Sequence, residues 1–133
     1  MYYLIFIALW VGGLQESRLN LEISGIEKIN GAIMVAVYDS KEDFLSQNMI
    51  SSGQFEVKTN LVKGHLSLPF GTYAISVFHD TNNDGELNSN FIGIPKEPIG
   101  FSKDAKGKFG PPKYEQAAVN FDRENQLLKI KLY

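Results

Sequence analysis

The chain is organised around residues 71–101, which read GTYAISVFHDTNNDGELNSNFIGIPKEPIGF. Successive side chains of an extended strand point to opposite faces, so every second residue from Tyr73 to His79 shares one face. We expect that apolar face to lie in the core. His79 stands alone at the strand end, with no cysteine in the chain and no second histidine nearby, which is typical of a hydrogen-bonded packing residue.

The strand runs into a loop dense in side-chain oxygens. Five residues occupy places where a calcium-binding loop has its ligands, four through side chains and Glu86 through its backbone carbonyl: Asp80, Asn82, Asp84, Glu86 and Asn88. Gly85 stands where such a loop turns sharply, and hard cations prefer oxygen ligands. The closing bidentate glutamate of an EF-hand is replaced by Phe91, and the preceding segment is a strand, so this is not an EF-hand. Asn90, water or Asp39 would have to complete the ligand shell.

The same loop residues also suit a simple polar turn. Asn, Asp and Gly tolerate positive φ angles and hydrogen-bond their own backbone, as any tight connection requires. Two interpretations therefore stay open for this loop, a calcium site and a turn without an ion.

Composition narrows the classes of function. The chain has 133 residues, which suits one domain, and its net charge of −2 with dispersed Lys and Arg argues against nucleic-acid binding. Cysteine is absent, so thiol catalysis, zinc–thiolate sites and disulfides are excluded. We expect a monomer.

The N-terminal stretch predicts export. Residues 2–11 are apolar, break at Gly12-Gly13, and are far fewer than the ~20 residues that a membrane-spanning helix needs. We therefore interpret residues 1–16 as a signal peptide and 17–133 as a single β-domain, periplasmic or extracellular and without a membrane span in its mature form. The alternative is a buried N-terminal strand or helix.

The alternation of apolar and polar residues along the chain predicts an all-β fold of about seven strands. Strands are expected near 19–23, 32–38, 55–61, 66–68 and 71–79, with a turn at Lys63-Gly64 and a terminal hairpin of 119–121 and 128–132. Residues 39–45 suit a short capped helix or turn, with Phe44 and Leu45 folded onto the core. These strands most simply form a two-sheet antiparallel sandwich. Its predicted core contains Ile33, Val35, Val37, Tyr73, Ile75 and Val77.

Residues 92–113 contain many Pro and Gly, so we expect one long ordered loop with a short extended piece at 99–102. Its apolar residues argue for order: Phe91, Ile92, Ile94, Ile99, Phe101 and Phe109. We expect them to cap one end of the sandwich, in preference to lining a ligand groove.

The elements FHD (78–80), NDG (83–85), GIPKE (93–97) and FGPP (109–112), in this order, resemble Domain of Unknown Function 2141, a family of small exported bacterial proteins. The resemblance extends from about Leu19 to the C-terminus. It implies export and a single β-domain, and no activity. The strand entry PFGTY (69–73) is more weakly similar to transthyretin-like and carboxypeptidase-regulatory-like sandwiches, which favours a prealbumin-like or immunoglobulin-like topology.

Two functions follow as expectations. The first is an exported, non-enzymatic module that binds a protein or small-molecule ligand in the cell envelope, with calcium bracing the loop. The alternative is a hydrolase with an acidic and histidine site on residues 79–101, although no GxSxG or HExxH motif accompanies it.

Overall fold

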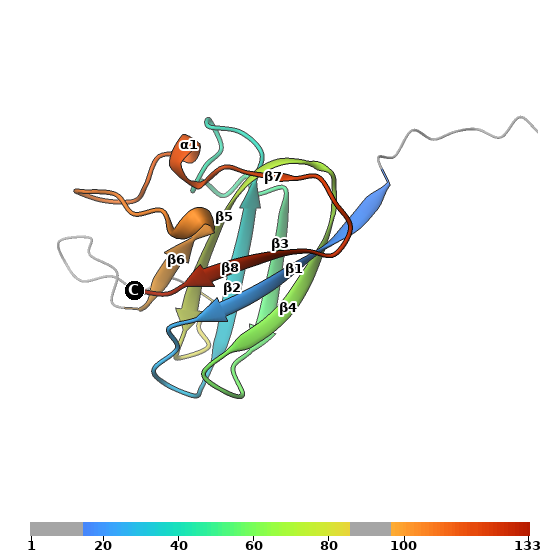
Figure 1. The fold of residues 1–133 in the computed structure, drawn as a ribbon. Coiled ribbons are helices and arrows are strands. Elements are labelled where there is room, and N and C mark those ends of the chain that lie inside the picture. The colour runs from blue at the N-terminus through green and yellow to red at the C-terminus, as the bar shows by residue number, and fades with distance from the viewer. Residues whose placement is uncertain (1–14, 86–96) are drawn as a thin grey trace, which may run out of the picture.

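The computed structural model describes residues 15–85 and 97–133 (Figure 1). The described chain contains, in order, β1 Glu16–Ser24, β2 Ala32–Tyr38, β3 Ser51–Glu56, β4 Val62–Pro69, β5 Gly71–Asp80, β6 Ile99–Phe101, the short 3₁₀ helix η1 Ser102–Asp104, α1 Tyr114–Ala117, β7 Val119–Phe121 and β8 Gln126–Lys131. No helix among the described residues is long and apolar enough to cross a membrane.

Two sheets form the predicted sandwich. One has three strands in the order β4-β1-β8, and the other has the order β3-β2-β5-β6 with β7 also paired to β5. All pairs are antiparallel except β1 with β8, which run parallel. The all-β sandwich is confirmed, with this one parallel pair as a departure from a purely antiparallel arrangement.

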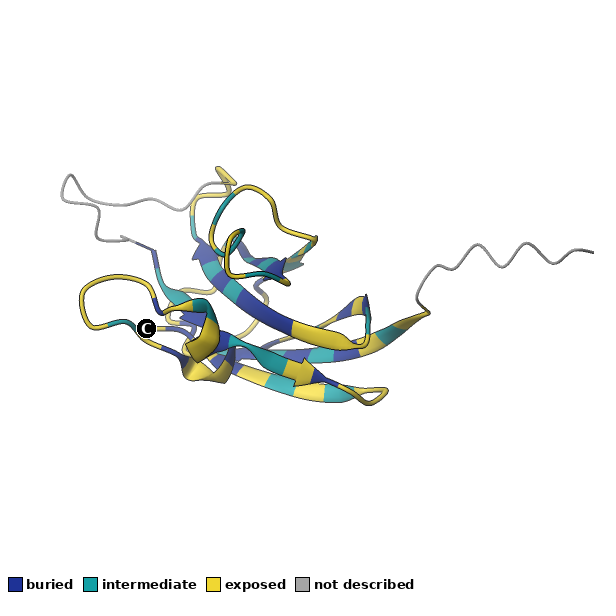
Figure 2. Cartoon of the chain, turned by 90° about the horizontal axis from the view of Figure 1, so that it is seen from above, coloured by how far each residue is buried: buried dark blue, intermediate teal, exposed yellow. Residues whose placement is uncertain are grey.

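The core lies between the two sheets (Figure 2). Buried residues alternate with less buried ones along most of β1, whereas β2 has no exposed residue. All six residues predicted for the core are buried, with side-chain exposures of 5% or less: Ile33, Val35, Val37, Tyr73, Ile75 and Val77. Opposing them from the other sheet are Leu19, Leu21, Ile23 and Ile130. The alternating pattern therefore assigned the buried face correctly.

Two predicted connections are wrong. Residues 119–121 and 126–131 do not form a hairpin, because β7 pairs with β5 and β8 pairs with β1 in the opposite sheet. Lys63 and Gly64 are not a turn but lie inside β4, opposite Glu22 and Leu21 of β1. In both cases the chain crosses between the sheets. The strand predicted at 55–61 is also misplaced, because β3 ends at Glu56 and residues 57–61 connect it to β4.

The outer face of β5 is covered by a second, smaller apolar cluster. Ala74, Phe101, Ala105 and Ala117 are buried there, with Phe44, Ile99 and Tyr114 packed against them. Residues 39–45 form a turn that brings in Phe44, whereas Leu45 is 39% exposed instead of packing on the core. The prediction that Ile99 and Phe101 pack against the sandwich is confirmed, and the extended piece is β6.

Buried Ser102 joins this layer to β5. Its Oγ accepts a hydrogen bond from the Ile75 N–H at 2.9 Å and donates one to the Ala117 carbonyl at 2.5 Å. Because β6 ends at Phe101, the Ser102 side chain takes the place that the next ladder residue would have held beside β5. One hydroxyl thus satisfies two buried backbone groups.

Candidate cation site at the end of β5

Asp80 ends β5 at the edge of the sandwich and is only 2% exposed. It is opposite Ala32, the first residue of β2. Gly31 precedes Ala32 with a φ of +64°, and a Cβ at Gly31 would lie 1.9 Å from the Asp80 carbonyl oxygen. The backbone of residue 31 therefore approaches Asp80 as closely as only glycine permits, which buries the start of the loop.

The chain after Asp80 forms a tight turn around the Asp80 carboxylate. Oδ1 accepts a hydrogen bond from the Asp84 N–H at 3.2 Å, and Oδ2 accepts one from the Gly85 N–H at 2.7 Å. Asn83 and Gly85 have φ angles of +57° and +75°, the conformation that Asn and Gly tolerate best. The Asp80 carboxylate thus organises the turn through backbone donors.

Glu97 approaches Asp80 from the other end of the connection. It is 6% exposed, and its Oε2 accepts hydrogen bonds from the Thr81 N–H at 2.7 Å and the Thr81 hydroxyl at 3.2 Å. The next residue, Pro98, accepts the His79 N–H at 2.9 Å and leads into β6. Antiparallel pairing of β6 with β5 therefore places the residue before β6 beside the residues after β5.

Three carboxylates meet at this point. Oxygen atoms of Asp80, Asp84 and Glu97, one from each, all lie within 4.8 Å of one another. Asp80 and Glu97 are buried and Asp84 is exposed, so the cluster opens to solvent on one side. Among the described residues no Lys, Arg or His forms an ion pair with Asp80. Grouped carboxylate oxygens are the ligand chemistry of hard divalent cations.

The predicted ligands have different outcomes. The fold brings Asp80 and Asp84 together, and the Asn82 side-chain oxygen lies in the same turn, accepting the Asp84 N–H at 3.3 Å. Glu86 and Asn88 lie outside the described residues, as do Asn90, Phe91, Ile92 and Ile94. Asp39 cannot complete the site, because it follows Tyr38 at the far end of β2 from Ala32.

Sequence reasoning missed Glu97 as a potential ligand. It is distant from Asp80 in the chain and does not belong to the calcium-loop spacing. The sequence shows an acid directly before Pro98 and a short extended segment, but the pairing of that segment with the strand that ends at Asp80 is seen only in the fold.

His79 is a packing residue, as predicted. Its ring is 1% exposed, and Nε2 lies 2.6 Å from the Asn30 carbonyl oxygen. Because a carbonyl only accepts hydrogen bonds, Nε2 carries a proton in this contact. A buried ring with this partner is not a surface base for hydrolysis.

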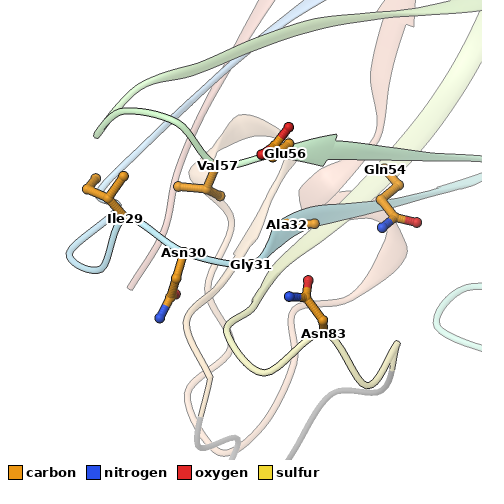
Figure 3. Close-up of a pocket in the computed structure, with 8 residues that line it drawn as sticks. All are labelled: Ile29, Asn30, Gly31, Ala32, Gln54, Glu56, Val57 and Asn83. Carbon is orange, nitrogen blue, oxygen red and sulfur yellow. The ribbon is translucent and has the colours of Figure 1, made fainter.

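A shallow hollow of about 690 Å³ lies beside the turn (Figure 3). Its lining comes from the segment before β2, the end of β3 and the turn: Ile29, Asn30, Gly31, Ala32, Gln54, Glu56, Val57 and Asn83. The Asn83 side chain projects toward β2. The hollow is mostly polar. Asn83, which lines it, directly precedes Asp84 in the turn.

Comparison with known proteins gives a family. A family model described as "Uncharacterized protein conserved in bacteria (DUF2141)" matches residues 21–129. No curated protein and no solved structure matches the chain. The matched range includes the three carboxylates of the cluster.

Proposed function

This chain belongs to the bacterial family of uncharacterized proteins DUF2141, whose description names no activity, and on the geometry of its site we propose that it is an exported, non-enzymatic β-sandwich module with a calcium-binding brace. The ion would be bound by Asp80, Asp84 and Glu97. The observation that carries the proposal is the meeting of these three carboxylates, two of them buried, at the ends of one connection.

Calcium fits this set of donors better than a transition metal. The donors are carboxylate oxygens without sulfur, and neither histidine belongs to the cluster. Calcium takes six to eight oxygen ligands in flexible geometry, so backbone carbonyls and water can fill the open side at Asp84. Magnesium demands a stricter octahedron and gives up its water reluctantly, which makes it a useful control.

Such an ion would act as a brace. Asp80 belongs to the end of β5, Asp84 to the turn and Glu97 to the residues before β6, so one ion would tie both ends of the 81–97 connection together. The hollow beside Asn83 supports binding of a partner or small ligand at this end of the sandwich. We expect the bound partner or ligand to be a molecule of the cell envelope. We expect the module to act as a monomer. No observation favours the hydrolase alternative.

Export is supported by the sequence that precedes the first described strand. The first strand starts at Glu16, directly after the apolar stretch and its glycine break. Cleavage shortly before Glu16 would keep every strand of the described residues and remove Trp10, the only tryptophan. Intact mass and tryptophan fluorescence of the secreted or periplasmic protein test this directly. Recovery of Trp10 in that fraction would refute export by cleavage.

The cation proposal is tested by thermal unfolding in chelator, magnesium and calcium. Extracellular calcium modules bind with a Kd of ~10⁻⁴–10⁻³ M, so ~5 mM calcium should stabilise the fold by about 1–2 kcal/mol. Asp84→Asn should remove most of this increment, because the exposed Asp84 supplies a ligand and little packing. The matched control is Asp122→Asn, an exposed acid on the β7–β8 turn, which should keep it.

Equal melting temperatures of the wild-type protein in calcium, magnesium and chelator would refute the cation site. The Asp80 hydrogen bonds would then serve only the turn.

A further inference from the structure

The segment between η1 and α1 concentrates positive charge. Residues 103–113, KDAKGKFGPPK, hold four lysines and one aspartate, although the whole chain has a net charge of −2. We call this segment the lysine loop. It projects away from the two sheets, beside the C-terminus (Figures 1 and 2).

Phe109 lies in the lysine loop and is fully exposed. Its side chain has a relative exposure of 103%, the largest of any exposed apolar residue in the described chain. The prediction that it caps the sandwich with Ile99 and Phe101 is therefore wrong. A ring that contacts nothing in its own fold has all of its apolar area available for another surface.

The two arms of the lysine loop lie close together. A Cβ at Gly107 would lie 2.1 Å from the Gly110 carbonyl oxygen, so the two arms of the loop touch, and Gly110 has a φ of +150°. Ala105 and Pro112 are buried at the base of the loop. The loop is thus a closed turn that contains the exposed Phe109.

All four lysines of the loop are exposed, and Lys113 lies close enough to Glu115 of α1 for the two charges to interact. None of them forms an ion pair among the described residues. Lys106 lies over the Tyr133 ring with its Nζ 4.5 Å from the ring centre, and Asp104 accepts the Lys131 backbone N–H at 2.9 Å. Four lysines and one aspartate leave the loop with a formal net charge of +3.

We propose that the lysine loop docks on an anionic phospholipid surface, with Phe109 inserted at the headgroup level and the lysines beside the lipid phosphates. Aromatic rings and flanking cations are the pattern by which proteins lie on charged membranes. A protein partner fits less well, because a stable protein interface needs about 800 Å² on each side, more than one projecting turn offers. This inference does not depend on the cation site.

The test is sedimentation with vesicles of phosphatidylcholine alone or of phosphatidylcholine and phosphatidylglycerol in equal parts. The protein is purified as the cell produces it, with or without cleavage of the N-terminal stretch, so that the wild-type protein and every variant have the same N-terminus. A chelator is present throughout, which separates this result from the cation site. We expect binding to the anionic vesicles, weakened when salt rises from ~0.1 to ~1 M because the screening length falls from about 10 to 3 Å.

Two loop variants have matched controls. Lys106→Gln with Lys108→Gln should weaken binding about 25-fold, since each lysine at such a surface contributes about five-fold. Lys58→Gln with Lys63→Gln makes the same charge change near the β3–β4 connection and should leave binding within about two-fold, because those lysines lie away from the membrane.

Phe109→Ser should weaken binding about ten-fold or more. Its control is Leu127→Ser, which removes a partly exposed apolar side chain from β8. Melting temperatures show that all variants fold.

Equal binding to neutral and anionic vesicles would overturn the proposal. So would loop variants that bind like the wild-type protein, or binding to an acidic polypeptide such as polyglutamate without binding to vesicles.

Discussion

Replacing Glu97 separates its role as a ligand from its role in the turn. Glutamine keeps the shape of the side chain, and its amide oxygen can still accept the Thr81 N–H that now lies 2.7 Å from Glu97 Oε2. It removes the negative charge that a cation would use. Alanine removes both the charge and the hydrogen bonds to Thr81.

The magnitudes follow from mass action. With a Kd of ~10⁻⁴–10⁻³ M and ~5 mM calcium, the wild-type protein should gain about 1–2 kcal/mol, or about 3–10 °C for a domain of this size. If the loss of one carboxylate weakens binding about ten-fold, the gain falls to about 0.2–1 kcal/mol. The melting temperature of Glu97→Gln should therefore be close to that of the wild-type protein in chelator and lower than it in calcium.

Glu97→Ala should melt lower than wild type even in chelator. A lost hydrogen bond to the carboxylate and an unpaired Thr81 N–H together cost about 1–3 kcal/mol. Differential scanning calorimetry of the three proteins, each with calcium and with chelator, gives all six values. If calcium raises the melting temperature of Glu97→Gln as much as that of the wild-type protein, Glu97 is not a ligand. If the melting temperature of Glu97→Gln lies below wild type by the same amount in chelator and in calcium, the role of Glu97 is structural only.

Three further predictions concern the sandwich, one of them at the backbone beside the site. Ser102→Ala should cost about 2–4 kcal/mol in urea unfolding, because it strands two buried backbone groups, whereas exposed Ser67→Ala should change stability by less than about 0.5 kcal/mol. Gly31→Ala should destabilise by at least about 2 kcal/mol and also reduce the calcium increment, because its Cβ collides with the Asp80 carbonyl; an unchanged melting curve would contradict the close approach. Burial raises the pKa of Tyr38 above its ordinary 10.0, so the unfolded chain loses the phenol proton at a lower pH than the folded protein does. The free energy of unfolding should therefore be constant just below pH 10 and fall as the pH rises above 10. Tyr38→Phe should lessen that fall in alkaline unfolding.

Part of the candidate cation site could be predicted from the sequence. The spacing of Asp80, Asn82 and Asp84 identified a turn rich in oxygen ligands, because these residues are neighbours in the chain and their proximity is a local property. Glu97 was not visible in this way. Its contact with Thr81 spans 16 residues and arises only because β6 returns antiparallel beside β5.

For the fold as well, the local features could be predicted from the sequence and the long-range pairings could not. Alternation with period two fixes which residues of a strand share a face, so Ile33, Val35 and Ile75 were correctly placed in the core from the sequence. The same period carries no information about which strand lies alongside, since each ladder is made of backbone groups that every sequence has. The parallel β1–β8 pair and the separation of β7 from β8 were therefore decided by tertiary packing. Phe109 illustrates the same limit, because its apolar character predicted burial, whereas the tertiary structure places it, fully exposed, in the turn between Gly107 and Gly110.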